Sequence, residues 1–146
     1  MTANHTLPKA PVALAAGDEM SRATVGPMTR TDFVRYAGAS GDFHPLHHDE
    51  PYARASGLAG VFGMGMLHGG MLGVHLARWV GPDNIRSFGI RFTGQVWPED
   101  LLTLAGQVER TEDADGGRRL AHLTMAVSRQ TGEQVITATA IVEVAR

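Results

Sequence analysis

The segment Gly65–Val80 reads GMLHGGMLGVHLARWV, and it decides the fold that this chain is expected to adopt. Apolar side chains cover most of the circumference that these residues would have as a helix, and a Gly-Pro pair follows directly, as is typical of a helix C-terminus. A helix that is apolar on nearly all sides should be buried. Gly69, Gly70 and Gly73 lower its helix propensity, so we expect them to permit the close approach of another backbone.

Beyond this segment the apolar residues alternate with a period of two, the period of a strand with one buried face. Four strands are predicted, around Phe88–Phe92, Leu102–Val108, Ala121–Val127 and Ile136–Val144. Turn-forming Asp, Gly and Thr residues separate the last three, which therefore form an antiparallel meander. Helices followed by a meander indicate an α+β fold, in which the sheet covers an apolar element, and the 65–80 helix is the obvious candidate.

Upstream of the central helix, the sequence predicts three shorter elements. Val12–Ala16 is expected to be a short strand. A helix follows, capped by Thr29 or Thr31 and ended by Gly41. A second, short helix is predicted at about Glu50–Ser56, with a proline at an early position where its missing N–H costs little.

Composition and charge exclude several classes of protein. The 146 residues fit one domain, with 43% apolar and 19% charged residues and a formal net charge of −2. The chain is not basic, so its charge does not indicate nucleic-acid binding. The absence of cysteine excludes disulfides, thiolate nucleophiles and Cys-based zinc sites. We find no signal peptide and no apolar run of membrane-spanning length, so we expect a cytoplasmic protein without a membrane partner. Residues 1–10 are expected to be flexible and residues 11–146 to form a single domain.

A loop of acid–base residues follows the first predicted helix, where residues 36–49 read YAGASGDFHPLHHD. Asp42 and His47 lie five residues apart on it, and a carboxylate and an imidazole held on one short loop can move protons to and from a bound water. Gly65 opens the central helix, where backbone N–H groups can hold an oxyanion. An acid, a base and an oxyanion donor together indicate chemistry beside a carbonyl group.

The histidines of this loop also suggest an alternative, a metal site. His44, His47 and His48 are all potential ligands. No further acidic residue or histidine lies nearby at a convincing helical spacing, so we expect no metal.

The 36–49 sequence resembles the signature of MaoC-like, (R)-specific enoyl-thioester hydratases. The resemblance extends from about Met28 to the C-terminus and continues through residues 57–67 and 88–92. In that family the loop reads Gly-Asp-x-Asn-Pro-x-His, and its catalytic Asp and His correspond to Asp42 and His47. The resemblance implies a hotdog fold, in which a curved antiparallel β-sheet wraps a long central α-helix.

The second motif of the family, His-Gly-Met, corresponds by spacing to residues 64–66. The resemblance therefore gives Gly65 the role of binding the thioester carbonyl. Two residues depart from the family pattern, because its Asn is His44 here and its second-motif His is Met64. We expect His44, Met64 and Met66 to help to shape the substrate pocket.

A competing alignment would place the His-Gly motif at His68-Gly69. It needs four inserted residues and puts Gly69 inside the helix, where the N–H is already bonded, so Gly65 is preferred. His68 and His75 are seven residues apart on one helical face. They either line an acyl pocket or are hydrogen-bonded histidines of the core, and we favour the second reading.

The resemblance implies an enzyme of fatty acid metabolism, a lyase that hydrates trans-2-enoyl thioesters or dehydrates 3-hydroxyacyl thioesters. No cofactor is expected, because coenzyme A or acyl carrier protein is part of the substrate. The expected assembly is a homodimer or higher oligomer, in which two sheets join edge to edge and two central helices lie side by side. The alternative is a pair of different hotdog chains in which this one is the catalytic subunit. A hotdog acyl-thioesterase would need a carboxylate on the central helix, and the absence of Asp and Glu from Gly57 through Gly81 counts against it.

Overall fold

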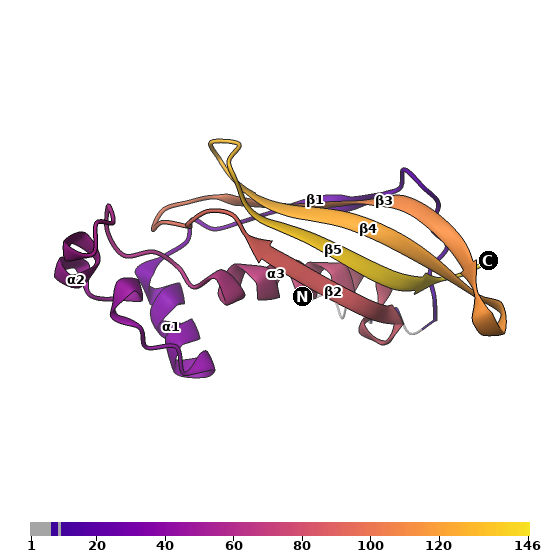
Figure 1. The fold of residues 1–146 in the computed structure, drawn as a ribbon, viewed down its shortest axis with the longest axis horizontal. Helices are drawn as coiled ribbons and strands as arrows, with labels where there is room; N and C mark the ends of the chain where they lie inside the picture. The colour runs from indigo at the N-terminus through magenta and orange to yellow at the C-terminus, as the bar shows by residue number, and fades with distance from the viewer. Residues whose placement is uncertain (1–6, 9) are drawn as a thin grey trace, which may run out of the picture.

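A five-stranded antiparallel sheet arches over one long helix in the computed structural model, which describes residues 7, 8 and 10–146 (Figure 1). In chain order the elements are β1 (Glu19–Val25), α1 (Arg30–Ser40), the 3-10 turn η1 (Pro45–His47), α2 (Glu50–Ala55), α3 (Gly65–Val80), η2 (Pro82–Asn84), β2 (Ile85–Phe92), β3 (Leu102–Ala114), η3 (Asp115–Gly117), β4 (Arg118–Arg129) and β5 (Gln134–Val144). The strand order is β1-β3-β4-β5-β2, and α1 and α2 lie beyond one end of the sheet. The predicted α+β class and hotdog architecture are confirmed, as are the bounds of α3.

The first helix also begins and ends where the sequence predicted. The Asp32 N–H donates to Thr29 Oγ1 over 3.1 Å, and the Asp32 carboxylate accepts from the Thr29 N–H over 2.9 Å, which completes a capping box. Hydrogen bonds from Thr29 hold the pKa of Asp32 below its usual value. Gly41 ends α1 with a left-handed φ of 77°, which glycine adopts without strain. These two ends fix the direction in which the chain enters the Asp42 loop.

The strand nearest the N-terminus is not where the sequence predicted it. β1 is Glu19–Val25, at the edge of the sheet beside β3, whereas Val12–Ala16 contributes only an isolated bridge at Ala13. The pairing register of β1 shifts between Met20 and Ala23. Such a bulge breaks the alternation of buried residues, so β1 carries no run with a period of two. The sheet therefore has five strands, the four predicted after the central helix and β1, which replaces the strand expected at Val12–Ala16.

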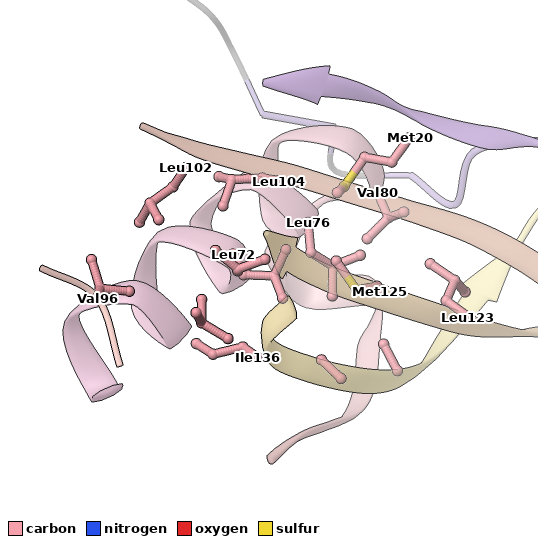
Figure 2. Packing of buried hydrophobic residues seen from close by; sticks show 14 of the residues in the cluster. Met20, Leu72, Leu76, Val80, Val96, Leu102, Leu104, Leu123, Met125 and Ile136 are labelled. Carbon is pink, nitrogen blue, oxygen red and sulfur yellow. The ribbon is translucent and has the colours of Figure 1, made fainter. Parts of the chain in front are cut away.

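The main core lies between α3 and the sheet. Figure 2 shows Leu72 and Leu76 of α3 close to buried side chains from the sheet, among them Leu104, Met125 and Ile136. A Cβ added to Gly69 would lie 2.6 Å from Cδ1 of Ile90 in β2. The close neighbour of this glycine is thus a side chain of the sheet, and not another backbone as the sequence suggested.

The opposite side of α3 is open in the single chain. Met66 and Val74 are 56% and 53% exposed, and Gly70 lies between them on the same side. Residues four apart form one stripe along a helix. The chain therefore buries one face of α3 and leaves an apolar stripe, Met66, Gly70 and Val74, uncovered.

The N-terminal prediction falls largely outside the described residues. The segment expected to be flexible, residues 1–10, includes residues 1–6 and 9, of which the structure gives no description. Within residues 7, 8 and 10–146, no helix combines the length and the apolar character needed to cross a bilayer.

Candidate active site

The loop after α1 brings Asp42 and His47 together. The Asp42 N–H donates to the Ser40 hydroxyl over 3.2 Å, and the His44 N–H donates to Asp42 Oδ1 over 3.3 Å, a short-range bond typical of Asx turns. The other carboxylate oxygen, Oδ2, lies 3.7 Å from His47 Nε2. This separation is longer than a hydrogen bond, and one water molecule beside the pair can lie within hydrogen-bond distance of both atoms.

The second ring nitrogen of His47 is fixed by the backbone. Its Nδ1 lies 2.6 Å from the carbonyl oxygen of Phe62, which can only accept a hydrogen bond. Nδ1 therefore carries a proton, and in the neutral ring Nε2 holds the lone pair that faces Asp42. The Phe62 ring packs against the imidazole with centroids 4.9 Å apart, and Trp97 packs against Phe62 in turn.

His47 and Gly65 line the same cavity, which has a volume of about 460 Å³. Its other lining residues come from the approach to α3, from α3 itself, from the end of β2 and the segment after it, and from β5: Phe62, Gly63, His68, Phe92, Thr93, Gly94, Gln95, Val96, Val135 and Ile136. Asp42 does not line the cavity, but its carboxylate reaches the His47 ring, which does. A hollow of about 720 Å³ on the sheet is larger, but it contains none of the three predicted functional residues.

Gly65 is the first residue of α3, so its N–H has no acceptor within the helix. A Cβ added to Gly65 would lie 2.6 Å from Cε1 and 2.7 Å from Cδ1 of Phe92, whose ring is half exposed. Glycine at this position therefore lets Phe92 pack against the start of the helix. Gly69 lies in the second turn of α3, where a helical N–H bonds to the carbonyl four residues earlier. The geometry thus favours Gly65 over Gly69 as a free donor.

None of the three predicted pocket residues lines this cavity. His44 is exposed and caps η1, where its Nδ1 accepts from the Leu46 N–H over 3.2 Å. Its ring centroid is 6.2 Å from that of His47, so it borders the Asp–His pair. Met64 is buried in the core, and Met66 lies on the open side of α3.

His68 lies in the cavity wall and lacks the hydrogen bond that the sequence led us to expect for a core histidine. It is 1% exposed, and its Nε2 has no hydrogen-bond partner. Burial lowers the pKa of His68 from 6.5 to about 4, with nearby Asp100 opposing the shift and His47 adding to it. His68 is therefore a neutral imidazole at physiological pH.

A buried carboxylate, Asp100, fixes the segment that forms one wall of the cavity. It is 3% exposed and bonds Arg129 through Nε at 2.7 Å and Nη2 at 3.1 Å, Gln130 at 2.8 Å and the Trp97 N–H at 2.8 Å. Burial alone would raise the pKa of Asp100, but the hydrogen bonds from Arg129, the Trp97 N–H and Gln130 hold it below its usual value. Residues 92–96 are thus held between β2 and this ionic cluster. The sequence alone gave no signal of this role.

The loop histidines that suggested a metal site have other partners. His48 Nε2 lies 3.1 Å from the Phe43 carbonyl oxygen, and His47 and His44 are bonded as described above. Within the described part of the chain, no group of three or more His, Asp or Glu side chains is arranged to hold a metal ion.

Comparison with known proteins identifies the family of this chain. The family model described as a MaoC like domain matches residues 12–133 of this chain. No curated protein matches the sequence.

Solved structures give the same fold. The R-hydratase PhaJ1 from Pseudomonas aeruginosa, in its unliganded form, is 26% identical over 91% of this chain and 84% of its own, with a TM-score of 0.75. The ChsH1-ChsH2 complex from Mycobacterium tuberculosis contains a chain that is 25% identical over 89% of this chain and 98% of its own, with a TM-score of 0.74. The (R)-hydratase from A. caviae involved in PHA biosynthesis has a TM-score of 0.77 at 22% identity, over 90% of this chain and 98% of its own, and so supports the fold alone.

Proposed function

This chain belongs to the family of MaoC-like domains, and on that premise we propose that it is an acyl-thioester hydratase or dehydratase. The reaction is the (R)-specific addition of water to trans-2-enoyl thioesters, or its reverse on 3-hydroxyacyl thioesters. The observation that carries the proposal is the approach of Asp42 Oδ2 to His47 Nε2 at 3.7 Å, next to a cavity that contains the start of α3. The R-hydratase among its structural neighbours supports the same class of reaction.

In the proposed mechanism, His47 moves the proton. Its Nδ1 donates to the Phe62 carbonyl, so Nε2 is the basic nitrogen and takes a proton from water as the water oxygen bonds to the β-carbon. The Asp42 carboxylate orients this water and stabilises the imidazolium that forms. The Nε2 proton then passes to the α-carbon, which returns His47 to its starting state and completes the addition of one water.

Gly65 has the complementary role of stabilising the developing negative charge. When oxygen attacks the β-carbon, electron density moves to the thioester oxygen as an enolate. The N–H of the first helical residue points away from the helix interior and has no partner there. The positive end of the α3 dipole lies at the same place and favours the enolate oxygen.

No metal or redox group takes part in the proposed reaction. The water supplies both the hydroxyl group and the proton, and the carrier, coenzyme A or acyl carrier protein, enters and leaves as part of the substrate. A carboxylate-dependent thioesterase reaction is less well supported, because the cavity wall contains neither Asp nor Glu.

Turnover of trans-2-butenoyl-CoA, followed by loss of the enoyl absorbance, tests the proposal. Asp42→Asn and His47→Ala should each lower kcat by about 100- to 10,000-fold, and the double variant should be little worse than either, because both groups act on one water. His44→Asn, outside the cavity, is the matched control and should keep its activity. Near-native turnover in either single variant, with folding intact, would refute the assignment. Chiral analysis of the 3-hydroxyacyl product tests the (R) configuration.

The proposed assembly is a homodimer in which the open stripes of two α3 helices face each other. Met66, Gly70 and Val74 form an apolar surface on the helix, and small residues permit close packing. The ChsH1-ChsH2 complex supports a second candidate, a heteromer in which this chain is the catalytic subunit. An active, stable monomer at micromolar concentration would refute both.

A further inference from the structure

His68 differs from every other histidine that the structure describes. His44, His47, His48, His75 and His122 each have a ring nitrogen within hydrogen-bond distance of a backbone or side-chain atom. His68 Nε2 has no partner, although the residue is 1% exposed. Because an unpaired buried polar atom lowers the stability of a protein, its presence in a cavity wall points to a partner that the chain itself does not supply.

The position of His68 places it beside the proposed reaction centre. It follows Gly65 by three residues and therefore lies on the same face of α3. Helical side chains lean toward the N-terminus, and the His68 ring accordingly reaches back to Gly63, where an added Cβ would lie 2.6 Å from its Cε1. His68 and Gly65 thus line one cavity from adjacent turns of one helix.

The proposed reaction leaves His68 without a role. The thioester oxygen is assigned to the Gly65 N–H, and the reacting water to Asp42 and His47. The rest of the wall combines the apolar side chains of Phe62, Phe92, Val96, Val135 and Ile136 with the polar residues Thr93 and Gln95. His68 is the one described histidine of this wall with a buried ring nitrogen that has no hydrogen-bond partner. A neutral imidazole offers one donor and one acceptor, which suits a hydroxyl or keto group.

We propose that His68 is a specificity-determining residue that hydrogen-bonds an oxygen substituent on the acyl chain, so that the cavity selects oxygenated acyl thioesters over plain hydrocarbon chains. This inference rests on the proposed hydratase function and adds the substrate class. A site built to bond a polar group discriminates against the analogue that lacks it, because the polar atom of the protein is then left unpaired.

The test compares four CoA thioesters with one chain length. These are trans-2-hexenoyl-CoA and its analogues with a hydroxyl group on carbon 4, 5 or 6. The wild type should hydrate at least one hydroxylated substrate with a kcat/KM about tenfold above that of the plain chain, the effect of one hydrogen bond. His68→Leu should bring the ratio to about one, whereas His68→Gln, which keeps a donor and an acceptor, should retain part of the preference.

A second readout separates this role from a structural one. Without substrate, His68→Leu removes an unpaired buried nitrogen and should raise the Tm by about 3 °C. The control is His75→Leu, on the same helix, whose Nε2 lies 2.6 Å from the Ser21 carbonyl oxygen and whose replacement should lower the Tm without altering substrate preference.

The outcomes distinguish this inference from the function on which it rests. Two results would overturn the role of His68 and leave the hydratase assignment standing. One is a wild type whose kcat/KM for the plain chain equals or exceeds its kcat/KM for all three hydroxylated chains. The other is a His68→Leu variant that keeps the wild-type preference. If the folded wild type hydrates none of the four thioesters, the proposed function itself fails, and this inference fails with it.

Discussion

Replacing Gly65 by proline tests the proposed oxyanion donor directly, because proline removes a single N–H. The position tolerates proline in other respects. Gly65 is the first residue of α3, where proline is favoured, and Met64 before it has φ −68° and ψ 130°, the extended conformation that a residue before proline requires. The helix should therefore keep its start.

Gly65→Ala is the matched control for the added side chain. Both variants place a Cβ 2.6 Å from Cε1 of Phe92, and both require that half-exposed ring to turn away. Only proline also removes the donor. The ratio of the two kcat values thus reports the effect of losing the N–H donor, together with any steric effect of the proline ring on the thioester oxygen.

The expected loss follows from the strength of such a donor. Removal of one oxyanion-hole donor costs about 3–4 kcal/mol of transition-state stabilisation, so Gly65→Pro should have a kcat roughly 100- to 1,000-fold below that of Gly65→Ala. The assay is butenoyl-CoA hydration at saturating substrate, with circular dichroism to verify helix content. Equal kcat values in two folded variants would refute the role of the Gly65 N–H and reopen the alignment on Gly69.

Three further predictions address assembly, backbone strain and pH. Val74→Glu should shift the protein toward monomer in sedimentation velocity without unfolding it, whereas Val34→Glu, at a residue 61% exposed on α1, should not; a dimer that persists in Val74→Glu contradicts helix-to-helix packing. Glu99 has a left-handed φ of 71°, which costs a non-glycine residue about 1 kcal/mol. Glu99→Gly should therefore leave the free energy of unfolding, measured by urea titration, unchanged or raise it by up to about 1 kcal/mol. A clear loss would show that contacts of the Glu99 side chain compensate the strain. The unfolded chain protonates His68 near pH 6.5 but the folded chain only near pH 4, so the free energy of unfolding should fall as the pH drops through this window, by about 3 kcal/mol at 1.36 kcal/mol per pKa unit. His68→Leu should flatten the plot of this free energy against pH between those two values. An unchanged slope would show that His68 is not held neutral.

The sequence predicted the elements whose signals are local. The bounds of α3 follow from an apolar run between Gly65 and a Gly-Pro stop, and those of α1 from Thr29 and Gly41. The proximity of Asp42 and His47 follows from their places on one short loop. Each of these depends on contacts over a few residues, which a pattern in the sequence can carry.

Features that depend on distant contacts were not predicted. β1 was missed because its bulge interrupts the alternation, and a bulge depends on the pairing with β3. The Phe62 carbonyl that sets the tautomer of His47 lies fifteen residues away, in an irregular stretch without a pattern. The position of His68 on a helical face does not reveal whether a hydrogen-bond partner lies within reach. In the structure His68 Nε2 has no partner, whereas His75 on the same helix lies close to the Ser21 carbonyl oxygen.

The anchoring of the segment after β2 has a consequence for how this protein can diversify. The Thr93 N–H bonds the Val135 carbonyl oxygen, the Val96 carbonyl oxygen accepts from the Gly63 N–H, and Asp100 is held by its ionic cluster. Gly94 is itself fixed, because its N–H also bonds the Val135 carbonyl oxygen and an added Cβ would lie 2.7 Å from Glu133 Oε1. Changes of sequence or length at Gln95 would reshape one wall of the cavity while these attachment points stay in place. Because the entropic cost of a loop grows only slowly with its length, an insertion there costs about a few tenths of a kcal/mol per residue. This short segment can thus change the shape of the cavity without any change in the Asp42 loop, the central helix or the sheet.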